Sequence, residues 1–362
     1  MLSRVNGPQT LGNGRGFWIA ATLVLVAALV YPMFSDPYDV GNAAYFLLWV
    51  FMALGLCLMW GYSGLLSFGQ TFFFGIGGYG YGILQINLGH ILAGPIAALV
   101  LAVGCTAAAA LVLGYFMIYG RIGGMFFGIV TFSVALALAY FLGQTAGPQW
   151  MVGSARLNGF NGMQGMSPLS LPWFGGPIDL EDTAFYYFLV VLLVFIYLSL
   201  RILVNTRFGN VLVAIREDAQ RAELLGYDVR KYQLGGFIIG SALAGLSGAL
   251  YTSWGQIITP SSVGLPAAVM PVVWVAFSGR SDLTACLSGT LVLLYLFQTI
   301  NVYSEQFALV LMGLLLVLTV LFAPRGFVIE LSELAGRLPR LLRGQPADTP
   351  DESVIGPVGG AG

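Results

Sequence analysis

The sequence predicts an all-α, polytopic membrane protein with about ten transmembrane helices. Only 9% of the 362 residues are charged, whereas soluble domains carry about 25%. The mean hydropathy is +0.85, and no Asp, Glu, Lys or Arg occurs between Val40 and Gly120. Apolar runs of about 20 residues indicate membrane-spanning helices, and several of them follow one another.

The apolar runs divide the chain into three parts. Residues 1–16 form a short N-terminal segment, and residues 17–328 form the transmembrane domain. Residues 329–362 hold a basic amphipathic segment and a polar, Pro/Gly-rich tail that we expect to be disordered. The domain contains ten expected spans, at 17–34, 43–60, 67–86, 91–119, 123–143, 184–204, 234–255, 266–279, 284–300 and 304–323.

The eighth expected span is short and contains Pro266 and Pro271. A re-entrant segment at this position would move four C-terminal arginines to the outside, against the rule that Lys and Arg remain in the cytoplasm. We therefore count it as a crossing. With a cytoplasmic N-terminus, every Lys and Arg except Arg156 then lies inside. Both termini are cytoplasmic, residues 143–183 form an outer loop, and residues 205–233 form a cytoplasmic loop.

The sequence contains no pattern typical of catalysis or metal binding. The only lysine, Lys231, follows Arg230, so a phosphate-binding G-x-x-x-x-G-K-[ST] loop is absent. His90 has no companion, and the cysteines stand singly in apolar runs, where they read as packed side chains: Cys57, Cys105 and Cys286. We expect no catalytic residue, no metal and no cofactor, and the net charge of −1 argues against a nucleic-acid partner.

If the protein is a transporter, the ionisable residues inside its expected spans limit which energy source it can use. An ionisable residue at the centre of a span costs about 2.5–3.5 kcal/mol, so it usually marks a function. The expected spans hold none at mid-depth, which weakens a proton-driven transporter. Sodium coupling through backbone carbonyls of broken helices remains an alternative.

One sizeable polar stretch, residues 207–234, separates the sixth and seventh expected spans. Residues 210–225 have helical character, Gly226 stands where a C-terminal glycine belongs, and Asp228 is placed to cap the next helix. A solvated connector is the simpler interpretation of a charged run. We favour a partner-docking helix, because a connector requires neither a shaped helix nor a face of small residues.

Three stretches of the chain resemble the LivM-type permeases: VLVAIREDAQRAELLGYDVRKYQLGGFIIGSALAGLSGALY, ALGLCLMWGYSGLLSFGQTFFFGIGGYGYG and ALVLMGLLLVLTVLFAPRG. These permeases are inner-membrane subunits of ABC importers for branched-chain amino acids, and for urea or short-chain amides. The resemblance covers residues 43 to 328. It implies a type II ABC importer-like permease of the bacterial inner membrane.

The resemblance also implies partners. These are a homologous second permease, two ABC ATPase subunits that bind the ATP, and a soluble substrate-binding protein. The polar loop would be the coupling helix that contacts the ATPase, through Ala214, Arg216, Glu217, Asp218, Arg221, Ala222 and Gly226. The substrate would be a branched-chain amino acid, with urea or a short amide as the alternative.

Three further groups of residues are candidates. Ser63, Ser67 and Gln70 are expected along the translocation path, although serines in helices also bond to backbone carbonyls. Residues 158–165 stand where the family has an NGLTG-like segment, and here that segment reads NGMQG. Its candidates for outer-face contacts are Asn158, Asn161, Gly162 and Gln164. Small residues four apart predict close helix packing, either static or sliding, at Gly78, Gly82, Gly236, Gly240, Ala244 and Gly248. A second departure from the family is FSGRSDL at 277–283, where Asp282 is added.

Overall fold

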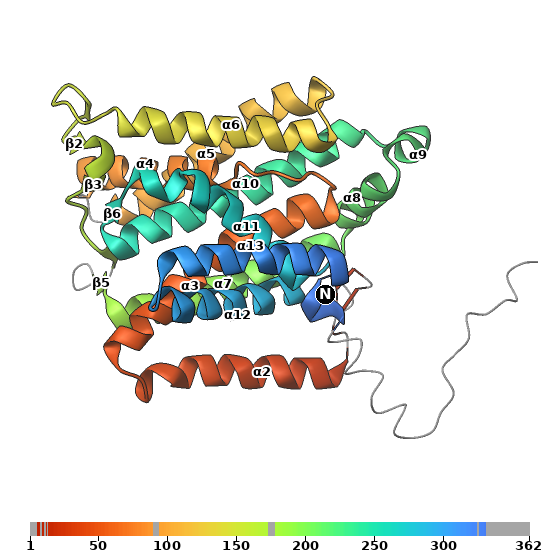
Figure 1. Cartoon of the computed structure of the whole chain (residues 1–362), viewed down its shortest axis with the longest axis horizontal. Helices are drawn as coiled ribbons and strands as arrows, with labels where there is room; N and C mark the ends of the chain where they lie inside the picture. The colour runs from red at the N-terminus through yellow and green to blue at the C-terminus, as the bar shows by residue number, and fades with distance from the viewer. Residues whose placement is uncertain are drawn as a thin grey trace, which may run out of the picture.

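The computed structural model describes residues 6–7, 9–10, 12, 14–89, 94–172, 178–323 and 326–330. Most of this part is helical, and the long helices lie side by side (Figure 1). They are α2 (Arg15–Val30), α3 (Pro37–Leu56), α4 (Gln70–Leu88), α5 (Gly94–Tyr119), α6 (Gly124–Gly143), α7 (Asp182–Val204), α10 (Val229–Gly255), α11 (Leu265–Ser278), α12 (Leu283–Asn301) and α13 (Glu305–Phe322). His90 and the tail after residue 330 lie outside the described residues.

The described structure is mostly helical, which agrees with the prediction of a polytopic helical membrane protein. Among the described residues, seven helical segments are long and apolar enough to cross a membrane. They contain α2, α3, α5, α6, α7, α10 and α12. The eighth expected span, α11, is a 14-residue helix with Pro271 in its interior. Length and apolar composition therefore account for seven of the ten expected crossings.

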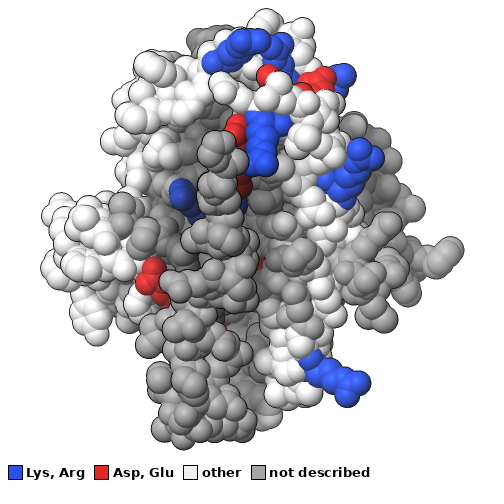
Figure 2. Space-filling view, turned by 90° about the vertical axis from the view of Figure 1, so that its right-hand side faces the viewer, with Lys and Arg blue, Asp and Glu red and all other residues white. Residues whose placement is uncertain are grey.

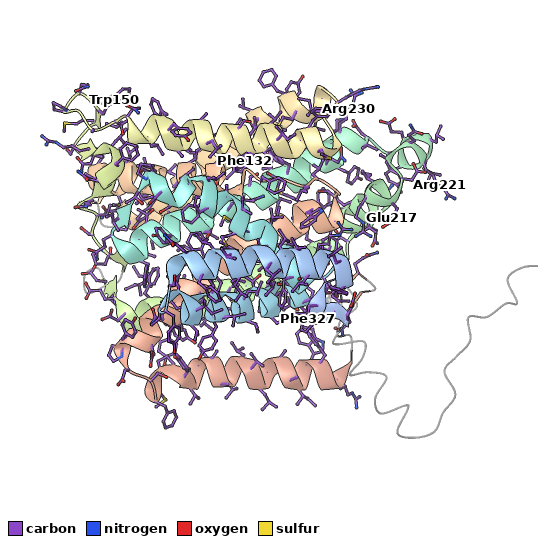
Figure 3. All side chains as sticks on the ribbon, in the orientation of Figure 1. Phe132, Trp150, Glu217, Arg221, Arg230 and Phe327 are labelled. Atoms are coloured by element: carbon purple, nitrogen blue, oxygen red, sulfur yellow. The ribbon has the colours of Figure 1, made fainter. Side chains whose placement is uncertain are left out.

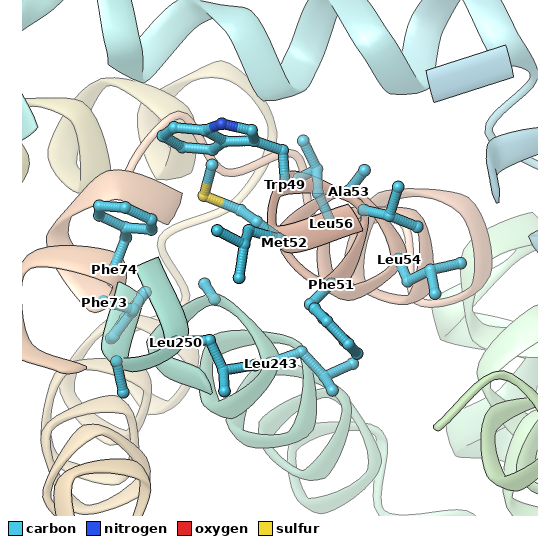
Figure 4. Packing of buried hydrophobic residues seen from close by; sticks show 14 of the residues in the cluster. Trp49, Phe51, Met52, Ala53, Leu54, Leu56, Phe73, Phe74, Leu243 and Leu250 are labelled. Carbon is cyan, nitrogen blue, oxygen red and sulfur yellow. The ribbon is translucent and has the colours of Figure 1, made fainter. Parts of the chain in front are cut away.

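The centre of the bundle is α3, which packs against α4 and α10. Trp49 of α3 stacks on Phe74 of α4, with ring centroids 5.0 Å apart, and Leu250 of α10 is fully buried nearby (Figure 4). Lipid tails are as apolar as these side chains, so close packing, and not removal from water, must hold the helices together. By contrast, no residue of α2 is buried in the described structure.

The chain leaves α3 through an irregular segment. The helix continues as a π-helix, η2 (Cys57–Tyr62), and residues 64–69 are non-helical before α4 begins at Gln70. The third expected span, which starts at residue 67, therefore begins three residues later. Non-helical backbone at membrane depth is tolerated only where protein or a water-filled cavity surrounds it.

The loop between α6 and α7, expected as an outer loop, contains short antiparallel strands. These are β1 (Met151–Val152), β2 (Ala155–Arg156), β3 (Met163–Gln164), β4 (Leu169–Leu171) and β5 (Ile178–Leu180). Strand β3 pairs with β6 (Ile257–Ile258), which follows α10. This pairing fastens the loop to the end of α10. Trp150 packs edge-on against Phe141, while Trp173 and Phe174 lie outside the described residues.

The added Asp282 has a structural role. It is buried before α12, and its carboxylate accepts a hydrogen bond from the Ala285 amide at 2.8 Å. It thereby caps the first turn of α12, whose amides have no partner within the helix.

Candidate functional site

The polar stretch between α7 and α10 forms a helical hairpin at one end of the bundle, made of α8 (Arg207–Glu217) and α9 (Ala219–Leu224). We call residues 207–225, which are these two helices with the C-cap residue Leu225, the hairpin. Arg221 and Glu217 lie on it, and Trp150 lies at the opposite end of the molecule (Figure 3). The end that carries the hairpin also shows several Lys and Arg side chains (Figure 2).

The expectation of one helix over residues 210–225 is wrong. The chain breaks at Asp218, whose backbone is extended at φ −155° and ψ 99°. The Asp218 carboxylate accepts a hydrogen bond from the Arg221 amide at 2.9 Å. Aspartate competes in this way for amides at a helix start, so it favours a new helix over continuation of the old one.

The hairpin has a small apolar core of its own. Val211 and Ile215 of α8 pack with Ala222 of α9 and Val229 of α10. Ala222 is only 2% exposed, so it faces the protein itself and not a partner. The expectation that Ala222 belongs to a small-residue contact face is therefore corrected, because its small size fits the internal packing. Ala214 is exposed.

The turn out of α9 follows the sequence expectation. Gly226 has φ +86°, and its amide bonds to the Glu223 carbonyl at 2.9 Å. The Tyr227 amide bonds to the Ala222 carbonyl at 3.2 Å. These two bonds form a Schellman motif, in which glycine adopts the left-handed conformation at low cost.

Asp228 caps α10, as expected from its position. Its carboxylate accepts from the Lys231 amide at 3.3 Å and pairs with the Lys231 ammonium at 2.9 Å. These hydrogen bonds hold the pKa of Asp228 below its ordinary value, because they favour the charged carboxylate. The capping carboxylate is therefore charged at physiological pH.

Two leucines form the exposed tip of the hairpin. Leu224 is 89% exposed and Leu225 is 71% exposed, beside the exposed Arg221 and Glu223. The sequence analysis did not single them out. The sequence feature that could have identified them is an apolar pair in an otherwise charged stretch, immediately before the helix-ending Gly226. An apolar pair with charged neighbours is typical of a protein contact surface.

Arg216 points from the hairpin toward the bundle. Its Nη1 donates a hydrogen bond to the Gly61 carbonyl in η2, and its Nη2 pairs with the Glu217 carboxylate. The side chain is 30% exposed, against 68% for Glu217. Arg216 therefore lies at the surface together with Glu217 and Asp218, but one edge of its guanidinium contacts the bundle at Gly61.

The candidate path residues lie in the break between α3 and α4 and are all buried. The Ser63 hydroxyl donates to the Met59 carbonyl at 2.6 Å, as the alternative interpretation expected. Ser67 Oγ accepts from the Gly69 amide at 3.2 Å. Gln70 Nε2 contacts Met59 Sδ at 2.9 Å, and Gln70 Oε1 has no hydrogen-bond partner within the described residues.

The outer-face candidates lie in the strand-containing loop at the other end. Asn158 adopts the left-handed conformation at φ 57° before the short helix η3 (Gly159–Asn161). Gly162 is buried against the end of β6, while Asn161 and Gln164 are exposed. The exposed amides are thus available to a partner, and Asn158 and Gly162 shape the turn.

A family model described as "Branched-chain amino acid transport system / permease component" matches residues 40–320. The chain belongs to this permease family. It is 27% identical to the high-affinity branched-chain amino acid transport system permease protein LivM of Escherichia coli K12, over 90% of this chain and 80% of that protein. The LivM protein of Salmonella typhimurium LT2 is 26% identical, over 84% of this chain and 73% of that protein.

A more distant relative is a probable branched-chain amino acid transport permease protein LivM of Methanocaldococcus jannaschii. It is 26% identical, over 48% of this chain and 54% of that protein. No solved structure matches. The resemblance to LivM-type permeases read from the sequence is thereby confirmed. Relatives in this family are transport components, and the described residues contain no group of His, Cys, Asp or Glu suited to a metal ion.

The glycines of this permease bring three helices close together around α10. A Cβ on Gly240 would lie 2.6 Å from the Gly55 carbonyl oxygen of α3, and one on Gly248 would overlap the Phe74 carbonyl of α4. Ala244 is fully buried between them. Gly236 has only ordinary van der Waals neighbours.

The α4 glycines behave differently from one another. A Cβ on Gly78 would overlap Ile258 and approach the Gly248 carbonyl at 3.0 Å. Gly82 instead contacts Met163 and Met166 of the loop between α6 and α7, so its expected role in helix packing is corrected to loop packing. The small size of Gly82 leaves room for the methionine sulfur atoms.

Arg201 is a buried residue that the sequence analysis counted only among the inside charges. It lies one turn before the end of α7 and is fully buried. Its guanidinium donates to the Tyr197 hydroxyl and the Gly12 carbonyl, each at 2.8 Å. It also lies over the Phe17 ring at 4.7 Å. The sequence offered one sign of this role, an arginine within an apolar span, because a charge persists there only where it is paired.

Proposed function

We propose that this chain is one permease subunit of an ATP-binding-cassette importer and forms half of its translocation path. Separate ATPase subunits would supply the energy, since the sequence has no phosphate-binding loop. A second, homologous permease and a soluble substrate-binding protein would complete the assembly. Family membership supports this arrangement.

The observation that carries the docking proposal is the exposed apolar tip of the hairpin. Leu224 and Leu225 lie outside the protein's own core, at the end of a hairpin whose two helices share a small apolar cluster with α10. An ATPase with an apolar groove would bury both leucines, and the surrounding charges would set orientation. Glu217, Asp218 and Arg221 are the exposed residues available for those polar contacts.

The names of the two bacterial relatives indicate the substrate class. The two bacterial relatives are named as high-affinity transporters of branched-chain amino acids, and we propose the same substrate class here. If Ser63, Ser67 and Gln70, which are buried among apolar side chains, line the path, that path would suit a solute with an aliphatic side chain. Urea and short amides are the competing substrates in the assay below.

The proposed topology has ten crossings, with both termini in the cytoplasm and the protein in the bacterial inner membrane. Besides the seven long segments, α4, α11 and α13 would cross. The first of these has 19 residues and the second 14, so α11 would cross only with its flanking residues. Arginines at the hairpin end support a cytoplasmic hairpin.

The test uses the chain reconstituted in liposomes with its ATPase subunits and binding protein. ATP should drive uptake of radiolabelled leucine in preference to urea. Leu224→Asp should weaken ATPase co-purification about thirtyfold, because loss of a central apolar anchor costs about 2 kcal/mol or more. Gln220→Asp is the matched control, since it adds the same charge at an exposed position of the same helix.

Two outcomes would contradict the proposal. Undiminished ATPase binding by Leu224→Asp would exclude the leucine tip as the docking surface. Uphill uptake by the isolated chain in a sodium gradient, without any ATPase, would exclude an ATP-driven importer and favour the secondary transporter.

A further inference from the structure

We propose that Arg216 is a positioning residue that transmits movement of the hairpin to the break between α3 and α4. The inference rests on the proposed function, because it supposes that a partner moves the hairpin. It differs from the docking expectation drawn from the sequence, in which Arg216 itself contacts the ATPase.

Arg216 contacts two residues, Gly61 and Gly64, on either side of the turn at which the break between α3 and α4 begins. On one side its guanidinium donates to the Gly61 carbonyl of η2. On the other side its stem packs against Gly64, where a Cβ would lie 3.3 Å from Arg216 Cγ. Gly64 has φ +73°, a conformation that glycine adopts without strain. A displacement of Arg216 therefore acts on residues 61–64 directly.

The hydrogen bond from Arg216 to the Gly61 carbonyl lies where a movement of Arg216 would displace the end of η2. The last carbonyls of a helix have no partner within it, and π-helical turns are frequent at functional sites. Gly61 also lies so close to the Arg280 carbonyl that no Cβ would fit. Gly61 is thus enclosed between Arg216 of the hairpin and the turn between α11 and α12.

The hairpin can act as a lever because α8 and α9 share one small core. Val211 and Ile215 of α8, Ala222 of α9 and Val229 of α10 form this core, so a displacement of the leucine tip reaches α8 and Arg216 through direct packing. Arg216 lies in the last turn of α8, at the joint with α9. Movement of the tip would therefore reach the joint without being absorbed by the hairpin.

The candidate path residues lie immediately beyond the Arg216 contact. Met59, which belongs to the same π-helix as Gly61, accepts from the Ser63 hydroxyl and contacts the Gln70 amide. Gln70 Oε1 is buried and has no hydrogen-bond partner within the described residues. An unpaired buried carbonyl is costly, so a small shift of η2 that gives it a partner would be favourable. The break is thus the place where hairpin movement can alter the path.

The experiment measures ATP hydrolysis and substrate uptake in the same proteoliposomes, with the complete importer. Arg216→Ala should lower uptake per ATP hydrolysed about fivefold or more, the usual range for coupled sites, with ATPase co-purification unchanged. Arg216→Lys should restore part of it, because an ammonium can donate to one carbonyl but cannot form the planar arginine contacts.

Arg221→Ala is the matched control, since it removes the same side chain from an exposed position of the hairpin. It should weaken ATPase co-purification and leave uptake per ATP unchanged in complexes that assemble. The proposal is overturned if Arg216→Ala couples as well as wild type, or if it loses ATPase binding in parallel with Arg221→Ala. A wild-type complex that shows no ATP-driven uptake would overturn the proposed function instead.

A second measurement applies if Arg216→Ala does not assemble. A Ser63→Cys reporter, in a background with the exposed Cys105 replaced by Ala, is labelled with a small maleimide in the nucleotide-free and vanadate-trapped complex. Labelling should differ between the two states in the presence of Arg216, and this difference should shrink in Arg216→Gln. An equal difference in both proteins would overturn the proposal.

Discussion

Arg201 is a buried residue that fastens a peripheral helix to the bundle. Helix α2 buries none of its own residues in the described structure, yet its first turn lies against Arg201 through Phe17 and Trp18. The preceding segment is held by Asn205, whose side-chain oxygen accepts from the Gln9 amide at 3.2 Å. The N-terminal segment was expected only as a cytoplasmic extension, but this part of it is packed.

Arg201→Ala should release this segment. The substitution removes charge-assisted hydrogen bonds to Tyr197 and Gly12, so we expect a loss of about 2–3 kcal/mol in stability. Thermal unfolding in detergent and limited proteolysis near residue 12 measure the effect. Arg207→Ala is the control, because Arg207 is exposed and surface substitutions usually cost about 0.5 kcal/mol or less. Equal behaviour of the two variants would exclude the fastening role.

At the scale of helices, the backbone contacts around α10 constrain the sequence more than the apolar side chains do. Gly248→Ala would place a methyl group against the Phe74 carbonyl of α4. Overpacking of this kind costs about 1–3 kcal/mol, and here a backbone atom would have to shift. We expect a lower unfolding temperature and reduced uptake. Gly313→Ala, which meets open space in α13, should leave both unchanged and is the control.

Most helices were predictable because apolar runs between charged or glycine-rich segments dictate them. The expected spans at 123–143, 184–204 and 284–300 agree with α6, α7 and α12 to within two residues at each end. These boundaries are local properties of the chain. The resemblance to LivM-type permeases was likewise visible, because the motifs that carry it are contiguous stretches.

The contacts that define the candidate site were not predictable in the same way. Spacing identified Gly240 and Gly248, but it did not identify Gly55 or Gly77, because a close approach depends on which neighbouring helix faces the glycine. Periodicity placed Ala222 on a face of small residues without showing that the face turns inward. The inward direction of Arg216 similarly depends on the position of Gly61, which is distant in sequence.

For the whole molecule, the clearest difference between the two ends of the bundle is in the number of Lys and Arg residues. The hairpin end carries Arg207, Arg221, Arg230 and Lys231, while Arg156 lies in β2 at the opposite end (Figures 1 and 3). Lys and Arg are retained on the cytoplasmic side during insertion. In the proposed topology, this asymmetry would place the leucine tip on the cytoplasmic side, where ATP is available.

Cysteine labelling from the two sides of the membrane tests this orientation. Glu217→Cys at the hairpin and Asn161→Cys in the opposite loop are both exposed, so equal reactivity is expected wherever the reagent has access. With Cys105 replaced by Ala, a membrane-impermeant maleimide should label Asn161→Cys in right-side-out vesicles and Glu217→Cys only in inverted ones. The reverse pattern would place the hairpin outside the cell, beyond the reach of any ATPase, and both the docking and the positioning proposals would fail with it.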